Sequence, residues 1–320
     1  MFNKLNMRNK HHTKKVRGSL NLCVVFFLFS SLLSGLILLL LFMNGTLWES
    51  SSSTNYQYNA TGIALFIILL LIGLVVICAI CIMFLVMTSS PIFTVEDLES
   101  IVHSAVNDFN LYIANQPKHK ILQRAVDHFD DEIIEHYNKH SLQEETLIDA
   151  QIVEELLNFI HERFTEAYPD LIIPDGRWAY NVVGGIYARQ KILLANFKEY
   201  ICLWGSPLPQ SGFSGYFPWL NEGDVMIKGT VRSSDPESAL SAYRKYEFGD
   251  TSYLKNGHRR HYTMSPNCYM ASFAVHKDTQ MILTFWPGIK DSDWKSFWIQ
   301  IFDACKGIRL WIMYRLAGGA

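Results

Sequence analysis

Two stretches, DVMIKGTVR at residues 224–232 and CYMASFAV at residues 268–275, decide the fold of the second half of this 320-residue chain. From about residue 224 the sequence changes from a helical period to an alternating one, which indicates β-strands with one buried face. Gly, Asn, Pro and Asp separate the strands, and Asn256-Gly257 predicts a hairpin turn, since such a turn needs positive φ. We therefore expect an antiparallel sheet, with further strands at residues 243–248, 259–264 and 280–286.

The region before these strands is expected to be helical. Thr94, followed three residues later by Asp97, is typical of a helix start. His136 and His140 are four residues apart, a spacing that metals use, but no third ligand stands at a defined distance. A polar helix surface is therefore the expectation there, and no metal or other cofactor is expected. Amphipathic helices are predicted at three places, residues 95–114, 119–140 and 150–167.

The amino-terminal part is predicted to cross a membrane twice. The chain is 49% hydrophobic and 18% charged, and residues 19–43 and 62–88 contain no Asp, Glu, Lys, Arg or His. Each exceeds the roughly 20 residues that a spanning helix needs. A cleaved signal peptide is the alternative for the first span, but its apolar run is too long. Six Lys and Arg residues within residues 1–18 favour a cytoplasmic tail, so the chain after the second span is expected on the cytoplasmic side.

The charge and cysteine content exclude two classes of protein. The chain after residue 88 carries 22 basic and 29 acidic residues, whereas a nucleic-acid binder needs a basic face to neutralise phosphate. Six cysteines are scattered, and Cys78 and Cys81 lie inside an apolar run. Neither a disulfide framework nor a zinc site is therefore indicated.

A basic tetrad and a carboxyl-terminal apolar stripe each allow two interpretations. His258, Arg259, Arg260 and His261 form a basic tetrad that is expected to be exposed to solvent, with contact to lipid phosphate as the alternative. The carboxyl-terminal stretch places Trp and other apolar residues at helical spacing, and Gly307 is expected to divide it into two helices. Lys and Arg flank the apolar stripe, so a place at the bilayer interface is favoured over packing against the core. The stripe comprises Trp294, Phe297, Trp298, Ile301, Phe302, Cys305, Ile308 and Ile312.

Residues from about 181 to the carboxyl terminus resemble the family that joins the sigma-1 receptor and the fungal sterol C8 isomerase. The resemblance rests on the order and nearly ungapped spacing of several short motifs rather than on one decisive motif. These are Gly184-Gly185, Glu199-Tyr200, Gly205, Ser214-Gly215, Asp224, Gly229-Thr230, Gly249-Asp250, Pro266-Asn267 and Met270.

The resemblance implies a cupin-like β-barrel around an apolar cavity, with carboxyl-terminal helices on the endoplasmic reticulum membrane. It also implies a homo-oligomer, often a trimer, and sterol-like or cationic amphiphilic ligands. In the family a glutamate contacts the ligand amine, an aspartate shares a proton with that glutamate, and a tyrosine hydrogen-bonds it. The tyrosine falls on Tyr200 and the aspartate on Asp224, but Ser272 stands in place of the glutamate and Leu254 in place of a family histidine.

A hydroxyl cannot replace an acid in proton transfer, so the sequence leaves Asp224 as a lone candidate carboxyl. The favoured function is therefore a sigma-receptor-like, non-catalytic membrane protein that binds an apolar, sterol-like or amphiphilic molecule in the barrel. Sterol C8 isomerisation is one alternative. The other is a structural adaptor that contacts membrane proteins and whose barrel is filled by aromatic side chains, including Trp219. The expected ligand-binding residues are Asp224, Tyr200, Ser272, Trp204, Phe213 and Phe217, while Glu199 is expected in a structural ion pair or at the surface.

The expected fold class is α+β, and the chain divides into seven parts. These are a basic tail at 1–18, a membrane helix at 19–43, a lumenal loop at 44–61, a membrane helix at 62–88, an amphipathic helical region at 89–170, a β-barrel at 171–291 and membrane-associated helices at 292–320.

Overall fold

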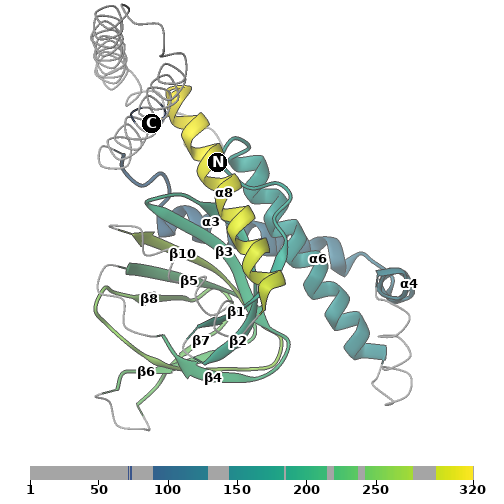
Figure 1. Cartoon of the computed structure of the whole chain (residues 1–320). Coiled ribbons are helices and arrows are strands. Elements are labelled where there is room, and N and C mark those ends of the chain that lie inside the picture. The colour runs from purple at the N-terminus through teal and green to yellow at the C-terminus, as the bar shows by residue number, and fades with distance from the viewer. Residues whose placement is uncertain are drawn as a thin grey trace, which may run out of the picture. The chain divides into compact units, whose positions relative to one another are not determined.

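The computed structural model describes residues 89–128, 144–183, 185–214, 220–236, 242–276 and 293–319, together with Leu71 and Gly73. The chain divides into two compact units, one of residues 91–316 and one of residues 1–90 with 317–320. The first unit carries both sheets and all the helices discussed below (Figure 1).

The helical predictions are largely confirmed. Thr94 caps the first helix through a reciprocal pair of hydrogen bonds with Asp97, as its spacing predicts. The third helix begins six residues before the predicted start. The helices are α3 (Val95–Ala114), α4 (Lys118–His128), α6 (Glu144–Ala167) and α8 (Trp294–Leu316).

The strands form two antiparallel sheets rather than a closed barrel. The larger sheet has the order β1-β2-β3-β10-β5-β8, and the smaller has the order β4-β9-β6-β7. No backbone ladder joins an edge of one sheet to an edge of the other among the described residues. The strands are β1 (Trp178–Val183), β2 (Ile186–Ala195), β3 (Glu199–Ser206), β4 (Gln210–Phe213), β5 (Leu220–Lys228), β6 (Val231–Ser234), β7 (Arg244–Tyr246), β8 (Thr251–Leu254), β9 (His261–Met264) and β10 (Cys268–His276).

The turn at Asn256-Gly257 joins two strands that belong to different sheets. Gly257 has a φ of 73°, as a tight turn requires. However, β8 pairs with β5, while β9 pairs with β4 and β6, so the predicted hairpin is wrong. The chain passes here from the larger sheet to the smaller, and within the described residues the two sheets do not close into a barrel.

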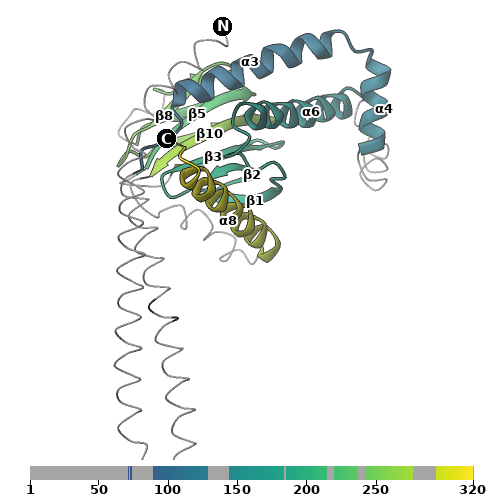
Figure 2. The same ribbon diagram turned by 90° about the horizontal axis from the view of Figure 1, so that it is seen from above.

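Helices α3 and α6 pack on one face of the larger sheet, whereas α8 packs against β1 and β2 and reaches residues of the other face. Figure 2 shows α3 and α6 on the side of β8, β5 and β10 and α8 beside β1 and β2. A Cβ placed on Gly223 of β5 would meet the side chain of Val95 at 3.1 Å, so α3 packs closely on that face. Because side chains alternate along a strand, Glu222 and Asp224 must point to the opposite face.

Helix α8 is continuous, so the predicted division at Gly307 is wrong. Gly307 is buried, and a Cβ there would lie 2.6 Å from the carbonyl oxygen of Ala195. The glycine therefore lets the helix backbone approach the end of β2 directly. Its helical cost of about 1 kcal/mol relative to alanine is offset by that close packing.

Glu199, the first residue of β3, hydrogen-bonds to the backbone of residues 92–93 and so links this segment to the larger sheet. Its carboxylate accepts hydrogen bonds from the backbone N–H groups of Ile92 and Phe93 and from the amide of Asn196. Burial raises the pKa of Glu199, and these hydrogen bonds together with the charge of Arg315 act in the opposite direction. Glu199 is thus structural through hydrogen bonds, and it is fully buried and not at the surface.

Within the described part of the chain, no helix combines the length and apolar character needed to cross a membrane. Residues 19–43, and residues 62–88 apart from Leu71 and Gly73, lie outside the described residues, so the two spans stay a prediction. The same applies to His136 and His140 and to the predicted strand at 280–286.

Candidate functional site

The site is built around β10, which lies between β3 and β5 in the larger sheet. The register places Ser272 opposite Cys202 on one side and Asp224 on the other. Two residues further along β10, Ala274 lies opposite Tyr200 of β3 on one side and Glu222 of β5 on the other. These side chains share the face of the sheet that α3 does not cover, since directly opposed residues in a sheet point the same way.

Ser272 and Asp224 are joined by a short hydrogen bond. The Ser272 hydroxyl donates to Oδ1 of Asp224 at 2.5 Å. Burial raises the pKa of Asp224 to about 6, while this hydrogen bond and the charge of Arg260 act to lower it. Ser272 therefore stabilises the ionised form of the aspartate without supplying a second acid.

Glu222 supplies the second acid, so the expectation of a lone carboxyl is wrong. It precedes Asp224 by two positions on β5 and projects from the same face, where adjacent same-face positions are roughly 7 Å apart. Burial, and then the neighbouring charge of Asp224, raise the pKa of Glu222 to about 8. Near neutral pH the pair thus combines a protonated carboxyl with an ionised one. The signal in the sequence was the i, i+2 spacing of the two acids in a strand.

Arg260 is the second functional residue that sequence reasoning missed. His258, Arg259 and His261 are exposed, as expected for the basic tetrad, but the side chain of Arg260 is only 11% exposed. Its Nε donates to Asp235 at 3.3 Å and its Nη1 lies 3.5 Å from the hydroxyl of Ser252.

Ser252 lies opposite Asp224 in the pairing of β5 with β8. The guanidinium of Arg260 therefore lies on the side of the acidic pair that faces β8.

A second polar group lies on β2 and β3. Tyr200 is buried, and its hydroxyl has no hydrogen-bond partner of normal geometry among the described residues. Burial raises the pKa of Tyr200 well above its ordinary value. The amide of Gln190 donates to the Cys202 sulfur at 3.2 Å and its oxygen accepts from Asn181 at 2.6 Å. Among the described residues the Tyr200 hydroxyl thus lacks a hydrogen-bond partner, and in the strand register Tyr200 and Glu222 lie on either side of Ala274.

Apolar residues enclose these polar groups. On one side, Tyr200, Cys202 and Ala274 belong to a core cluster that packs against Phe297, Ile301 and Ile308 of α8. On the other side, Met226 and Met270 belong to a cluster with residues of the smaller sheet, among them Val231 and Met264. Tyr262 of the smaller sheet lies close enough for Asp224 and Glu222 to raise its pKa, after burial itself. The acidic pair therefore lies between the two sheets.

The remaining expected residues have different positions. Trp204 is half-buried, packs against both apolar clusters and has an indole N–H without a hydrogen-bond partner among the described residues. Phe213 is 56% exposed on β4. Leu254, in the position of the family histidine, is buried opposite Glu222. Phe217 and Trp219 lie outside the described residues.

The described residues contain no group of three or more His, Cys, Asp or Glu side chains that could hold a metal ion.

Residues 128–285 match the family model described as "ERG2 and Sigma1 receptor like protein". This part of the chain is therefore similar to the ERG2 and sigma-1 receptor family. The matched segment contains both sheets and every residue of the acidic group, including Glu222, Asp224, Arg260 and Ser272. The resemblance expected from the sequence is thereby confirmed.

Two relatives within the ERG2 and sigma-1 receptor family illustrate the extent of the match. The "Protein erg2 homolog" of Dictyostelium discoideum is 28% identical over 121 residues, which cover 38% of this chain and 51% of that protein. The "Sigma non-opioid intracellular receptor 1" of Danio rerio is 29% identical over 108 residues, which cover 33% of this chain and 47% of that protein. The chain thus spans about half the length of the curated relatives it matches.

Solved structures outside the ERG2 and sigma-1 receptor family also show a partial likeness. KdgF from Halomonas sp. is 15% identical and has a TM-score of 0.28, with 35% of this chain and 98% of that chain covered. A cupin-2 domain protein from Shewanella frigidimarina is 10% identical and has a TM-score of 0.22, with 26% and 76% covered. The two-sheet architecture rests on the chain's own strand pairing and not on these scores.

The raised pKa of Glu222 predicts a specific pH dependence of stability. In the folded protein Glu222 keeps its proton up to about pH 8, because its pKa is raised to about 8, whereas in the unfolded chain it loses that proton near its ordinary pKa of 4.5. The folded state therefore binds more protons across this range, and stability falls as pH rises through it. Glu222→Gln should flatten that fall, as measured by the Tm of the detergent-solubilised full chain between pH 5 and pH 8.

Glu247→Gln is the matched control, because Glu247 is exposed. It should keep the slope of the native chain. Equal slopes for the native chain and Glu222→Gln would show that Glu222 is not buried beside Asp224.

Proposed function

We propose that the protein binds an apolar, sterol-like or amphiphilic small molecule between its two sheets, with the polar group of that molecule at Glu222 and Asp224. The observation that carries this proposal is the pair of acids on one interior face of β5. Two carboxyls are costly to bury, and a purely structural interior has no need of both.

The partial solvent accessibility of Glu222 and Asp224 supports the presence of a space that a ligand could occupy. Glu222 and Asp224 keep part of their accessible surface, although burial is the main cause of their raised pKa. Groups that are desolvated yet still accessible are expected to line an internal space. The free hydroxyl of Tyr200 and the free indole N–H of Trp204 add two unused polar atoms on the same face. Apolar walls with a few converging polar groups are typical of small-molecule sites.

The proposal is tested by titrating the full chain, in lipid nanodiscs, with a fluorescent sterol that carries one hydroxyl. We expect saturable binding that weakens about tenfold or more in Asp224→Asn, because that variant changes the carboxylate that Ser272 and Arg260 hold in place. Asp250→Asn is the control, because Asp250 is exposed, and it should bind as the native chain does. Absence of saturable binding to the folded chain would contradict the proposal and favour the adaptor with a filled interior.

Double-bond isomerisation of a sterol is a second candidate, and one observation favours it. The pair offers a protonated acid beside an ionised one. A protonated Glu222 could add its proton to one carbon of a ring double bond, which leaves a positive charge on the other carbon. Asp224 could then remove a proton from the ring carbon next to that cationic carbon. The double bond then shifts, and the proton ends on Asp224, from which it returns to Glu222. The loss of an acid at position 272 is thus no obstacle to this chemistry.

Complementation of yeast that lacks sterol C8 isomerase separates binding from catalysis. A catalytic pair predicts growth with the native chain and none with Glu222→Gln, which keeps the shape of the side chain but cannot donate the proton. Ser272→Glu, which restores the family glutamate, should then rescue Glu222→Gln. Absence of growth with the native chain, at normal expression and with sterol binding intact, would remove this candidate and leave binding as the function.

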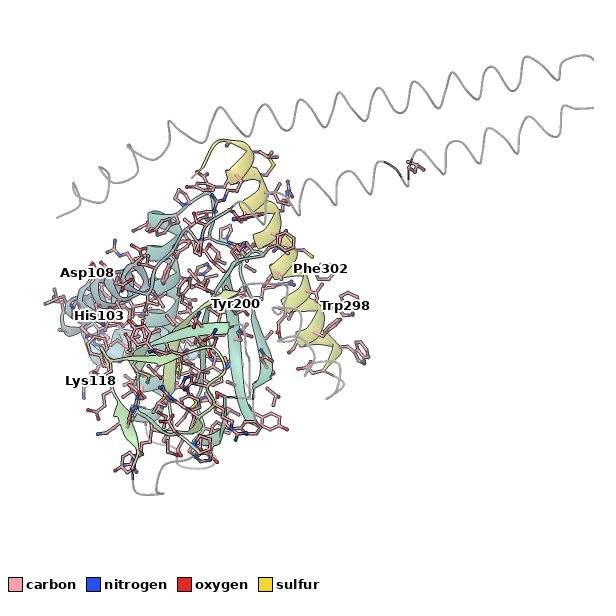
Figure 3. All side chains as sticks on the ribbon, turned by 90° about the vertical axis from the view of Figure 1, so that its left-hand side faces the viewer. His103, Asp108, Lys118, Tyr200, Trp298 and Phe302 are labelled. Atoms are coloured by element: carbon pink, nitrogen blue, oxygen red, sulfur yellow. The ribbon has the colours of Figure 1, made fainter. Side chains whose placement is uncertain are left out.

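We also infer that α8 lies at a bilayer surface, the place that its stripe of aromatic residues favours. The stripe divides into two: Phe297, Ile301 and Ile308 pack against the core, while Trp298 and Phe302 point outward (Figure 3). Trp294, Met313 and Leu316 extend the exposed row along the helix. Exposed aromatic residues with Lys and Arg neighbours suit the interface of a membrane. The endoplasmic reticulum as compartment, the trimer and protein partners remain expectations of the family resemblance.

Quenching of tryptophan fluorescence by brominated lipid tests this placement of α8. In proteoliposomes that hold the full chain, Trp298→Phe should reduce the quenchable fraction, since the indole would lie in the interface. Trp311→Phe is the control, because Trp311 is 1% exposed and should contribute nothing to quenching. An unchanged quenchable fraction in Trp298→Phe would place the helix away from lipid.

A further inference from the structure

We propose that Arg260 determines which head group the interior site accepts. Its guanidinium stands beside Asp224, where a cationic group of a ligand would pair, so the site selects a neutral polar head group over a cationic one. This inference rests on the proposed binding function and specifies its ligand class.

The backbone fixes Arg260 firmly at the edge of the two sheets. Its N–H donates to the hydroxyl of Ser214 at 2.9 Å, and its carbonyl accepts from the N–H of Ser214 at 2.8 Å. These two bonds tie the loop between β8 and β9 to the end of β4. Arg260 is thus held in place although its neighbours His258 and Arg259 are exposed.

The side chain then turns inward and not into solvent. Only 11% of it is exposed, and Nη1 reaches the hydroxyl of Ser252, which lies opposite Asp224. The charge of Arg260 favours the ionised form of Asp224 and opposes the rise in the pKa of Tyr262 across the sheets. The guanidinium therefore acts on both walls of the site.

The local charges are balanced before any ligand arrives. Arginine stays protonated at all relevant pH values, and Arg260, whose Nη1 lies 3.5 Å from the hydroxyl of Ser252 opposite Asp224, offsets part of the charge of Asp224. Asp235, the carboxylate that pairs directly with Arg260, is also within 3.9 Å of Arg244 near the surface. Glu222 keeps its proton near neutral pH, so it adds no negative charge. An entering ammonium group would find a single carboxylate, Asp224, whose charge is partly offset by Arg260 close by, whereas a ligand hydroxyl could hydrogen-bond to the same groups without repulsion.

Competition between two probes tests the inference. The full chain in lipid nanodiscs is titrated with a radiolabelled tertiary-amine amphiphile and, separately, with the neutral fluorescent sterol. Arg260→Gln should bind the amine at least tenfold more tightly than the native chain, a change of about 1.4 kcal/mol. Its affinity for the neutral sterol should stay within about threefold.

Two further variants keep the test informative. Arg259→Gln removes the same charge from an exposed neighbour, so its affinity for the amine should match that of the native chain. Arg260→Lys retains the positive charge but alters the packing, so it should still bind the amine weakly. A gain in amine affinity in this variant would point to loosened packing and not to the lost charge.

Equal amine affinity in the native chain and Arg260→Gln, or an equal gain in Arg259→Gln, would overturn the role of Arg260. Sterol binding in the same samples would show that the proposed function survives. If neither probe binds any variant, the proposed function itself fails.

Discussion

Two carboxyl groups on one strand, enclosed between two sheets, impose the main constraint on this protein. Ionising both would be unfavourable in such a setting, since each is desolvated and each repels the other. The surrounding side chains affect the two acids differently. Ser272 and Arg260 stabilise the charge of Asp224, and among the described residues no comparable group stabilises a charge on Glu222. The pairing of β10 with β3 and β5 is what brings these groups together.

Local signals in the sequence predicted local structure well. The cap of α3 depends on two residues three positions apart, Thr94 and Asp97, and it formed as expected. Gly307 and Asn256-Gly257 also marked special backbone positions, but their meaning depended on distant partners. Gly307 serves a contact with Ala195 more than 100 positions earlier, and the turn joins strands whose partners lie elsewhere in the chain. Spacing along one segment carries no information about such partners.

The site shows the same division between local and distant information. Asp224, Tyr200 and Ser272 could be located by resemblance, and the strand register brings Asp224 and Ser272 into direct contact. The resemblance predicts the second acid only at position 272, where this chain has a serine, and it carries no information about Glu222. Its distance from Asp224, two residues on a strand, was sufficient to place it on the same face. Arg260 could not be found from sequence, because only the contacts of its loop with Ser214 turn it inward.

The thiol at the centre of the site has a consequence for the cell. Cys202 lies directly opposite Ser272 in the pairing of β3 with β10, and burial raises the pKa of the Cys202 thiol to about 12. Oxidants and alkylating agents react with thiolates, and this thiol is almost never ionised. Among the described cysteines, Cys305 is exposed on α8, whereas Cys202 and Cys268 are buried. Oxidising conditions would therefore modify Cys305 on the outer surface of α8 and leave the buried Cys202 and Cys268 unmodified.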